Sequence, residues 1–162
     1  MATNPSADLV LTPLAGEARP LHDWLDMFLM CPVVLDPYTN ESSWVLKPAA
    51  RILAGLRGAD ARVNFVATCG PADAKRFLGP LAEEFLVFCD PDRAFVRSLG
   101  LATLPAFVFL RVDGTVPAAA EGWDPAAWHA VAEVIAETTA WSVPSLVAPG
   151  DPSPFHGTPA LG

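Results

Sequence analysis

The sequence predicts an α/β fold in which helices flank a mixed sheet with a parallel centre and a closing antiparallel hairpin. Short apolar runs rich in β-branched and aromatic residues lie at 32–36, 63–68 and 85–89, and segments with helical patterning separate them. That alternation is typical of crossover connections between buried parallel strands. The run 106–112 is followed by Asp113-Gly114 and a second run at 115–119, which is the pattern of a β-hairpin.

Weaker patterns precede the first strong strand. Residues 9–11 and 19–21 are short apolar or mixed segments on either side of the turn at 15–17, and they predict a small hairpin. Residues 21–28 predict a helix, because large apolar side chains recur three and four positions apart on one face: Leu21, Trp24, Leu25 and Phe28.

Helices are expected between the strands and after the last hairpin. Each has a start or stop signal in proline, glycine or an acidic capping residue. A polar loop at 37–44 leads into the first of them. The expected helices are 44–57, where Pro48 marks a kink or the true start; 71–85, interrupted at Gly79-Pro80; a segment from Asp90-Pro91 to Gly100; and a last helix from Asp124-Pro125 to about Thr139.

Composition bounds the possible functions. The chain has 162 residues, 52% of them hydrophobic and 17% charged, which fits one domain with a full core and excludes a disordered acidic chain. Its net charge of −8 argues against nucleic acid and anionic lipid, both of which attract basic surfaces. The apolar excess favours a surface shared with a protein partner, a larger complex or a second copy of the chain.

The sequence also predicts a cytoplasmic protein. No charged segment followed by an apolar stretch begins the chain, and the longest apolar run, 27–35, is too short to span a bilayer. The three cysteines are odd in number, widely spaced and without C-x-x-C or zinc spacing, which suits a reducing compartment.

Three segments are expected along the chain: a flexible N-terminus at 1–8, one domain at 9–140, and a proline-rich tail at 141–162. The tail holds five prolines and no lysine or arginine, so it should be extended. It is either a floppy extension or a strap that docks on its own domain or on a partner. We expect a strap, because several large apolar residues are unfavourable in water and can serve as anchors: Trp141, Leu146, Val147, Phe155 and Leu161.

The order of these segments resembles the thioredoxin-like superfamily, in its TlpA and peroxiredoxin-like (AhpC/TSA) branch, from about residue 9 to 137. The resemblance rests on the L-x-G-x-x-x-x-L segment at 14–21, the strand VVL, the proline-bearing helix KPAARIL, the strand VNFVAT, the stretch FCDPD before AFVRSLGL, and ATLPAFVFLRVDG. It implies a cis peptide bond at Leu104–Pro105. It further implies a peptide-binding face made of Leu104, Pro105 and Trp44, on which an extended chain could pair with the backbone of Leu104.

The resemblance also places the usual redox cysteines, and this chain lacks them. In that superfamily the thiols lie at the start of the first helix after the VVL strand, where the helix N-terminus lowers the thiol pKa. Counting eight and five residues back from Pro48 gives Asn40 and Ser43, within the stretch Asn40-Glu41-Ser42-Ser43. Neither an amide nor a hydroxyl can take part in thiol–disulfide exchange. The positions are therefore interpreted as a degenerate active site.

The remaining candidates are weaker. Cys31 begins a strand and is expected to be a buried, inert thiol. Cys69, in Thr68-Cys69-Gly70-Pro71, comes at a helix N-terminus that would lower its pKa, and it could lie near Cys89 at the end of a neighbouring strand. Asp36 and Glu41 are expected to be solvated or capping charges. The scattered histidines predict no metal site, and no motif points to a cofactor.

Three functions stay open at this point. The first is a redox-inactive protein that acts as a binding, assembly or accessory module; some silent members of the superfamily take part in the maturation of redox metalloenzymes, which is one form it could take. The alternative is a cysteine-based thiol oxidoreductase or peroxidase that uses Cys69, with or without Cys89. A purely structural subunit of a larger complex is a third possibility.

Overall fold

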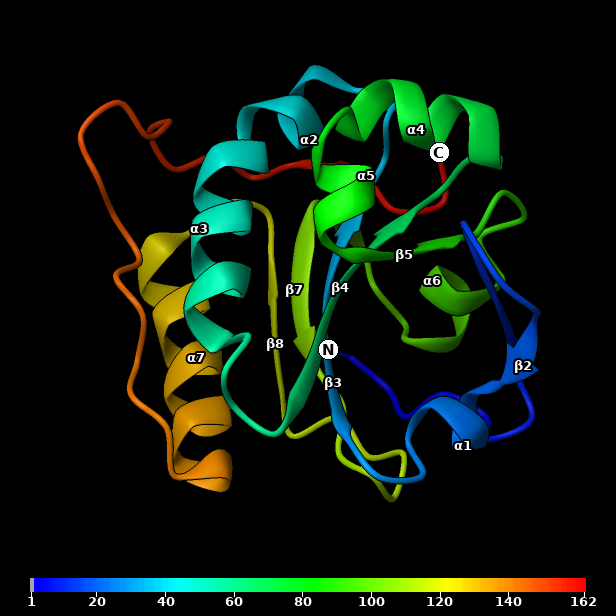
Figure 1. Cartoon of the computed structure of the whole chain (residues 1–162). Helices are drawn as coiled ribbons and strands as arrows, with labels where there is room; N and C mark the ends of the chain where they lie inside the picture. The colour runs from blue at the N-terminus through cyan, green and yellow to red at the C-terminus, as the bar shows by residue number, and fades with distance from the viewer. Residues whose placement is uncertain (1) are drawn as a thin grey trace.

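The computed structural model describes residues 2–162, so Met1 of the expected flexible N-terminus lies outside the described residues. Within them, a seven-stranded sheet has the order β2-β1-β5-β4-β3-β7-β8 (Figure 1). β3, β4 and β5 are parallel, β7 runs antiparallel to β3, and β8 closes the hairpin. The predicted mixed sheet is confirmed. The strands are β1 (Val10–Pro13), β2 (Arg19–Pro20), β3 (Leu29–Leu35), β4 (Ala61–Ala67), β5 (Leu86–Cys89), β7 (Ala106–Phe109) and β8 (Ala118–Glu121).

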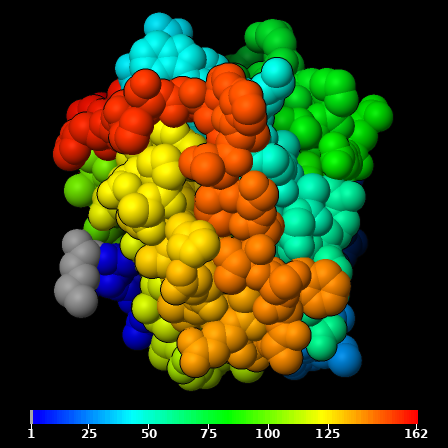
Figure 2. Space-filling model, turned by 90° about the vertical axis from the view of Figure 1, so that its left-hand side faces the viewer, coloured from blue at the N-terminus to red at the C-terminus, as the bar shows by residue number. Residues whose placement is uncertain are grey.

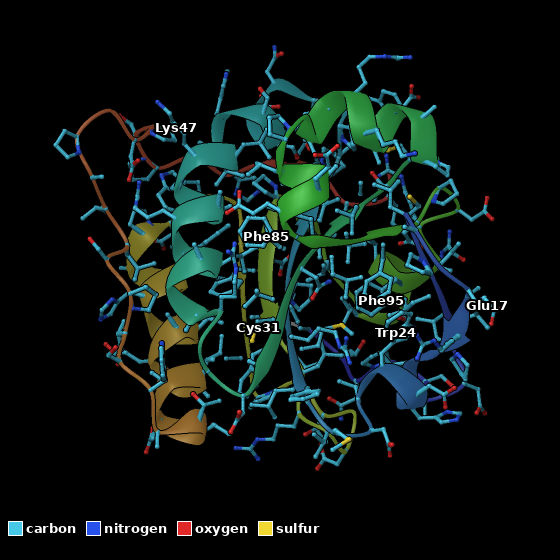
Figure 3. The ribbon with its side chains drawn as sticks, in the orientation of Figure 1. Glu17, Trp24, Cys31, Lys47, Phe85 and Phe95 are labelled. Atoms are coloured by element: carbon cyan, nitrogen blue, oxygen red, sulfur yellow. The ribbon has the colours of Figure 1, made fainter. Side chains whose placement is uncertain are left out.

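Helices cover both faces of this sheet. α3 (Leu46–Leu56) and α7 (Pro125–Thr139) lie on one face, and α1 (Leu21–Trp24) and α6 (Ala94–Ser98) lie on the other (Figure 1). Side chains alternate along β3, so Cys31 faces the α3 and α7 side and Met30 faces the opposite cluster. Figure 3 shows the same division, with Cys31 and Phe85 on one side and Trp24 and Phe95 on the other.

The expected helix at 44–57 divides into two elements. α2 (Asn40–Trp44) ends before Val45, and α3 begins at Leu46. Pro48 is the third residue of α3, where the backbone N–H has no intrahelical acceptor, so the proline removes no helical hydrogen bond. The expected helix at 71–85 is interrupted as the sequence indicated, between α4 (Pro71–Leu78) and α5 (Leu81–Glu84).

Several expected boundaries were wrong for identifiable reasons. The helix expected at 21–28 ends at Trp24, and Phe28 is 41% exposed, so it adds little to the buried face. The helix expected from Asp90 begins at Ala94, although Asp90 does serve its start: its carboxylate accepts the N–H groups of Phe95 and Val96, each at 3.1 Å. The strands expected at 106–112 and 115–119 shift to β7 and β8, so the Asp-Gly turn lies in a loop beyond the ladder.

α7 follows the sequence signals closely. The Asp124 carboxylate accepts the N–H groups of Ala126 and Ala127, and Pro125 occupies the first helical position. Trp128 fixes the helix to the sheet, because its indole N–H donates to the Gly122 carbonyl at 2.9 Å and its ring packs on Phe107. Among residues 2–162 no helix is both long enough and apolar enough to cross a bilayer.

Replacing Phe107 with alanine tests this core. Phe107 is fully buried in β7 and packs on Trp128, so Phe107→Ala should lower the free energy of unfolding by about 3–5 kcal/mol through lost burial and a cavity. Urea unfolding followed by far-ultraviolet circular dichroism measures the change. The matched control Val112→Ala removes a side chain that is 52% exposed and should change stability by less than about 0.5 kcal/mol.

Candidate functional site

The positions that the sequence resemblance interprets as a degenerate active site lie where β3 ends and α2 begins, at the carboxyl end of the parallel strands (Figure 1). Asn40 and Ser43 are exposed, Glu41 is partly exposed, and Ser42 is fully buried. The Ser42 hydroxyl accepts the backbone N–H of Asp36 at 2.9 Å, and the Ser43 hydroxyl donates to the Asn40 carbonyl at 2.6 Å. Both hydroxyls therefore hold the backbone of this turn.

Asp36 was expected to be a solvated or capping charge, and the solvated alternative was wrong. It is 4% exposed, and its carboxylate accepts the Tyr38 N–H at 3.1 Å and pairs with the Arg93 guanidinium at 2.9 Å. The pairing explains the burial, because a carboxylate leaves water only when charge and hydrogen bonds replace its hydration. Arg93 comes from the turn before α6 and also donates to the carbonyl of Ala160 in the tail, at 2.5 Å.

The cysteines are free and buried. Cys69 and Cys89 share a small cluster with Ala67 and Ala74, so the neighbouring strand ends do bring these two thiols together. The expected lowering of the Cys69 pKa was wrong, because burial, followed by the nearby Cys89 and acidic groups, raises it to about 11. Burial also raises the pKa of Cys89 against an opposing effect of Lys75, and it raises the pKa of Cys31 to about 12.

The residues before Pro105 bind the end of the chain's own tail. The Leu104–Pro105 peptide bond is cis. β6 (Thr103–Leu104) pairs antiparallel with β9 (Thr158–Pro159), with Leu104 opposite Thr158. The Glu121 carboxylate accepts the N–H groups of Ala102 and Thr103, at 2.6 and 2.8 Å. In the same stretch, the Ala102 carbonyl accepts the N–H of Ala160 in the tail at 2.9 Å.

Phe155 joins the tail to the rest of the predicted peptide-binding face. Its backbone exchanges two hydrogen bonds of 2.9 Å with Trp123, just after β8. Its ring meets that of Trp44 edge-on, with centroids 5.6 Å apart, and packs against the main core cluster. Trp44 still has 51% of its surface exposed. The tail thus crosses from β8 to β6 directly over the end of α2.

The first half of the tail lies along α3 and α7 (Figure 2). The indole N–H of Trp141 donates to the Gly55 carbonyl at 2.8 Å, and Leu146 is buried in the core cluster. Arg51 of α3 forms a two-pronged ion pair with Asp151, at 3.1 and 2.5 Å, and donates to the Leu146 carbonyl. These contacts fix residues 141–151 to the domain independently of β9.

Two of the expected anchors are not anchors. Val147 is 60% exposed, because side chains alternate in an extended chain and Leu146 takes the inward position. Leu161 is 55% exposed, since it follows Ala160, which is 1% exposed and occupies the buried position beside β6. Sequence reasoning favoured large apolar residues and so missed Ala160. It also missed Arg51, Arg93 and Asp151, whose only signal was that charged residues are scarce in this chain.

Comparison with solved structures identifies the fold. The putative thiol:disulfide interchange protein DsbE from Chlorobium tepidum is 19% identical, with a TM-score of 0.69 over 86% of this chain and 98% of that one. Peroxiredoxin Q from Xanthomonas campestris is 17% identical, with a TM-score of 0.62 over 83% and 91%. A secreted Mycobacterium tuberculosis disulfide oxidoreductase homologous to E. coli DsbE is 17% identical, with a TM-score of 0.58 over 72% and 85%.

The chain has the thioredoxin-like fold, and the predicted resemblance to its TlpA and peroxiredoxin-like branch is confirmed at that level. At these identities the likeness shows the fold alone. No protein-family model and no curated protein matches the sequence. Two of these neighbours are named for disulfide chemistry and one as a peroxiredoxin, whereas this sequence has no C-x-x-C pair.

The raised pKa values predict unreactive thiols. At pH 7 a disulfide dye such as DTNB should react slowly with the native protein, because Cys69, with a pKa of about 11, is almost entirely protonated and is buried. The rate should increase as the pH rises, and Cys89→Ala should remove the fastest phase, because Cys89 is 8% exposed against 2% for Cys69 and Lys75 opposes the rise of its pKa. All three thiols should react at once in denaturant. Rapid reaction of Cys69 at neutral pH would contradict this account.

The Arg51–Asp151 pair predicts that docking of residues 141–151 depends on pH. The hydrogen bond from Arg51 holds the pKa of Asp151 below its usual value. The stabilisation that the Arg51–Asp151 ion pair gives to the docked residues 141–151 is therefore fully present above the ordinary aspartate pKa of ~3.9. It is lost as the pH falls through the lowered pKa of Asp151. The NMR signal of the Trp141 indole N–H should shift in that acid range, with that of buried Trp128 as the internal reference. Asp151→Asn should shift the Trp141 signal at pH 7 and remove the acid step.

Proposed function

We propose that this chain is a redox-inactive thioredoxin-like protein that acts by binding another protein. The observation that carries the proposal is the turn at Asn40–Ser43. The site at which the sequence resemblance places the thiols holds an amide and hydroxyls instead, and both hydroxyls are engaged with the backbone. No sulfur nucleophile is available there.

The binding role is supported by what the same end of the sheet retains. β6 still pairs with an extended chain, here residues 158–159 of the tail, and Trp44 still offers an aromatic surface beside it. The alignment of backbone groups on β6 can supply affinity without any reaction. Assembly of a redox enzyme complex, which the sequence resemblance suggested, is one form that this role could take.

The alternative function, thiol chemistry at Cys69 and Cys89, has one observation in its favour: the two thiols share a cluster. Burial works against it, because it raises the pKa of both groups and limits access to them. The proposal and its alternative therefore make opposite predictions about turnover.

Turnover assays separate the two functions. The purified protein should neither reduce insulin disulfides nor consume hydroperoxide above the rate of its Cys69→Ser variant. The double variant Asn40→Cys/Ser43→Cys serves as the gain-of-thiol control, because both positions are exposed and should react with DTNB at neutral pH. Turnover by the native chain that Cys69→Ser abolishes would establish the alternative.

Capture of a partner tests the binding role. The full chain, tagged at its N-terminus to leave the docked C-terminus undisturbed, should retain a stoichiometric protein from its own cells, and Cys69→Ser should retain it equally. Retention that depends on Cys69 would instead indicate mixed-disulfide trapping.

A further inference from the structure

We propose that the face formed by β6, Gly122 and Trp44 binds an extended, uncharged polypeptide segment with an aromatic residue two positions before a glycine, and that residues 155–160 are a tethered copy of this ligand. The inference rests on the proposed binding function and specifies the chemistry of the partner. A partner segment would take the place of residues 155–160 while residues 141–151 stay docked.

Backbone contacts hold the tethered segment at both ends. At its start, Phe155 exchanges two hydrogen bonds with Trp123. At its end, Thr158 and Pro159 lie opposite β6, and the N–H of Ala160 reaches the Ala102 carbonyl. Any extended chain can offer these groups, so they provide affinity with little selectivity.

Glycine is selected where the two backbones approach most closely. Gly157 has a φ of +98°, and a Cβ on it would lie 2.6 Å from the Leu104 carbonyl oxygen. A Cβ on Gly122 would lie 2.3 Å from the His156 carbonyl oxygen. Contacts that short require the backbone itself to move. The ligand therefore needs glycine at the position that Gly157 occupies, and the site needs glycine at 122.

Side chains select at two further positions. The ring of Phe155 fills the space between Trp44 and the core cluster, which calls for an aromatic residue. Ala160 is 1% exposed, which calls for a small one. His156 and Pro159 are exposed, so their positions tolerate variation. The tail thus indicates a ligand with an aromatic residue, a glycine two positions later and a small residue three positions after that glycine.

Charge favours a neutral ligand. Within residues 2–162, the Arg93 guanidinium donates to the Ala160 carbonyl and is paired with the Asp36 carboxylate at 2.9 Å. Residues 155–160 contain no aspartate, glutamate, lysine or arginine, and the protein as a whole has a net charge of −8. The negative net charge of the protein would therefore disfavour an acidic partner segment.

The tail is built so that its end can exchange. The ion pair of Asp151 and the burial of Leu146 secure the first half, and the exposed residues 153–154 link it to Phe155. β9 itself is two residues long. A short tether gives the end a high effective concentration at β6, which a partner segment must overcome.

The experiment uses a fluorescent peptide with the sequence of residues 153–162 and the full-length protein. Gly157→Ala should displace the tail end, which chymotrypsin reports as faster cleavage after Phe155. The labelled peptide should then bind this variant at least tenfold more tightly than it binds the wild type, measured by fluorescence anisotropy. A peptide with alanine in place of its glycine should bind neither protein.

Gly150→Ala is the matched control. Gly150 also has a positive φ, +91°, and lies in the tail, but nothing lies within 4 Å of where its Cβ would be. This variant should behave like the wild type in cleavage and in peptide binding. Cleavage after Phe155 that stays as slow in Gly157→Ala as in the wild type would overturn the inference. Equal peptide binding to all three proteins would also overturn it. So would a failure of the peptide to bind Gly157→Ala when faster cleavage after Phe155 shows that its tail end is displaced.

These outcomes are separate from those of the proposed function. Partner capture by the full chain without peptide binding would refute the tethered ligand and leave the binding role intact. Thiol-dependent turnover would refute the proposed function whatever the peptide does.

Discussion

The ion pair between Arg93 and Asp36 holds together three parts of the chain that are far apart in sequence. Asp36 closes the first parallel strand, Arg93 precedes α6, and the same guanidinium donates to Ala160 in the tail. Both side chains are largely withdrawn from water, at 17% and 6% exposure. Removing one member of such a pair typically costs about 3–5 kcal/mol, because the remaining charge is left uncompensated. This ion pair therefore links the turn before α2 to the end of the docked tail.

The same aspartate also takes part in the turn at which the sequence resemblance places thiols. The backbone turn leading into α2 is held by hydrogen bonds that need no sulfur: the Ser42 hydroxyl accepts the N–H of Asp36, and the Asp36 carboxylate accepts the N–H of Tyr38. The remaining thiols lie in apolar surroundings that favour the protonated form. What this end of the molecule presents is a surface with strand-pairing groups.

Much of the fold could be predicted because its signals are local. The apolar runs that became β3, β4 and β5 and the Asp124-Pro125 start of α7 are read directly from neighbouring residues. The thioredoxin-like resemblance then placed Asn40, Ser43 and Pro105. The site's decisive contacts could not be read in this way. Arg93 meets Asp36 across 57 residues and Arg51 meets Asp151 across 100, and neither pair shares a pattern that sequence alone reveals. Burial reversed the expected pKa shift of Cys69 for the same reason, since exclusion of water is a property of the packed neighbours.

The prolines of the tail allow it to cover the edge of β6 without creating a new strand edge that another chain could pair with. An unpaired strand edge offers carbonyls and N–H groups to any other chain and is a route to aggregation. Here Glu121 takes the N–H groups of Ala102 and Thr103, and the tail covers β6 from its other side. Pro159, opposite Thr103, has no N–H to give to a further strand, so β9 cannot serve as a template in turn. Proline also restricts the undocked tail, so less conformational entropy is lost when it docks. β9 can therefore protect the edge of β6. Because β9 is only two residues long, it can also separate from that edge when a partner segment takes its place.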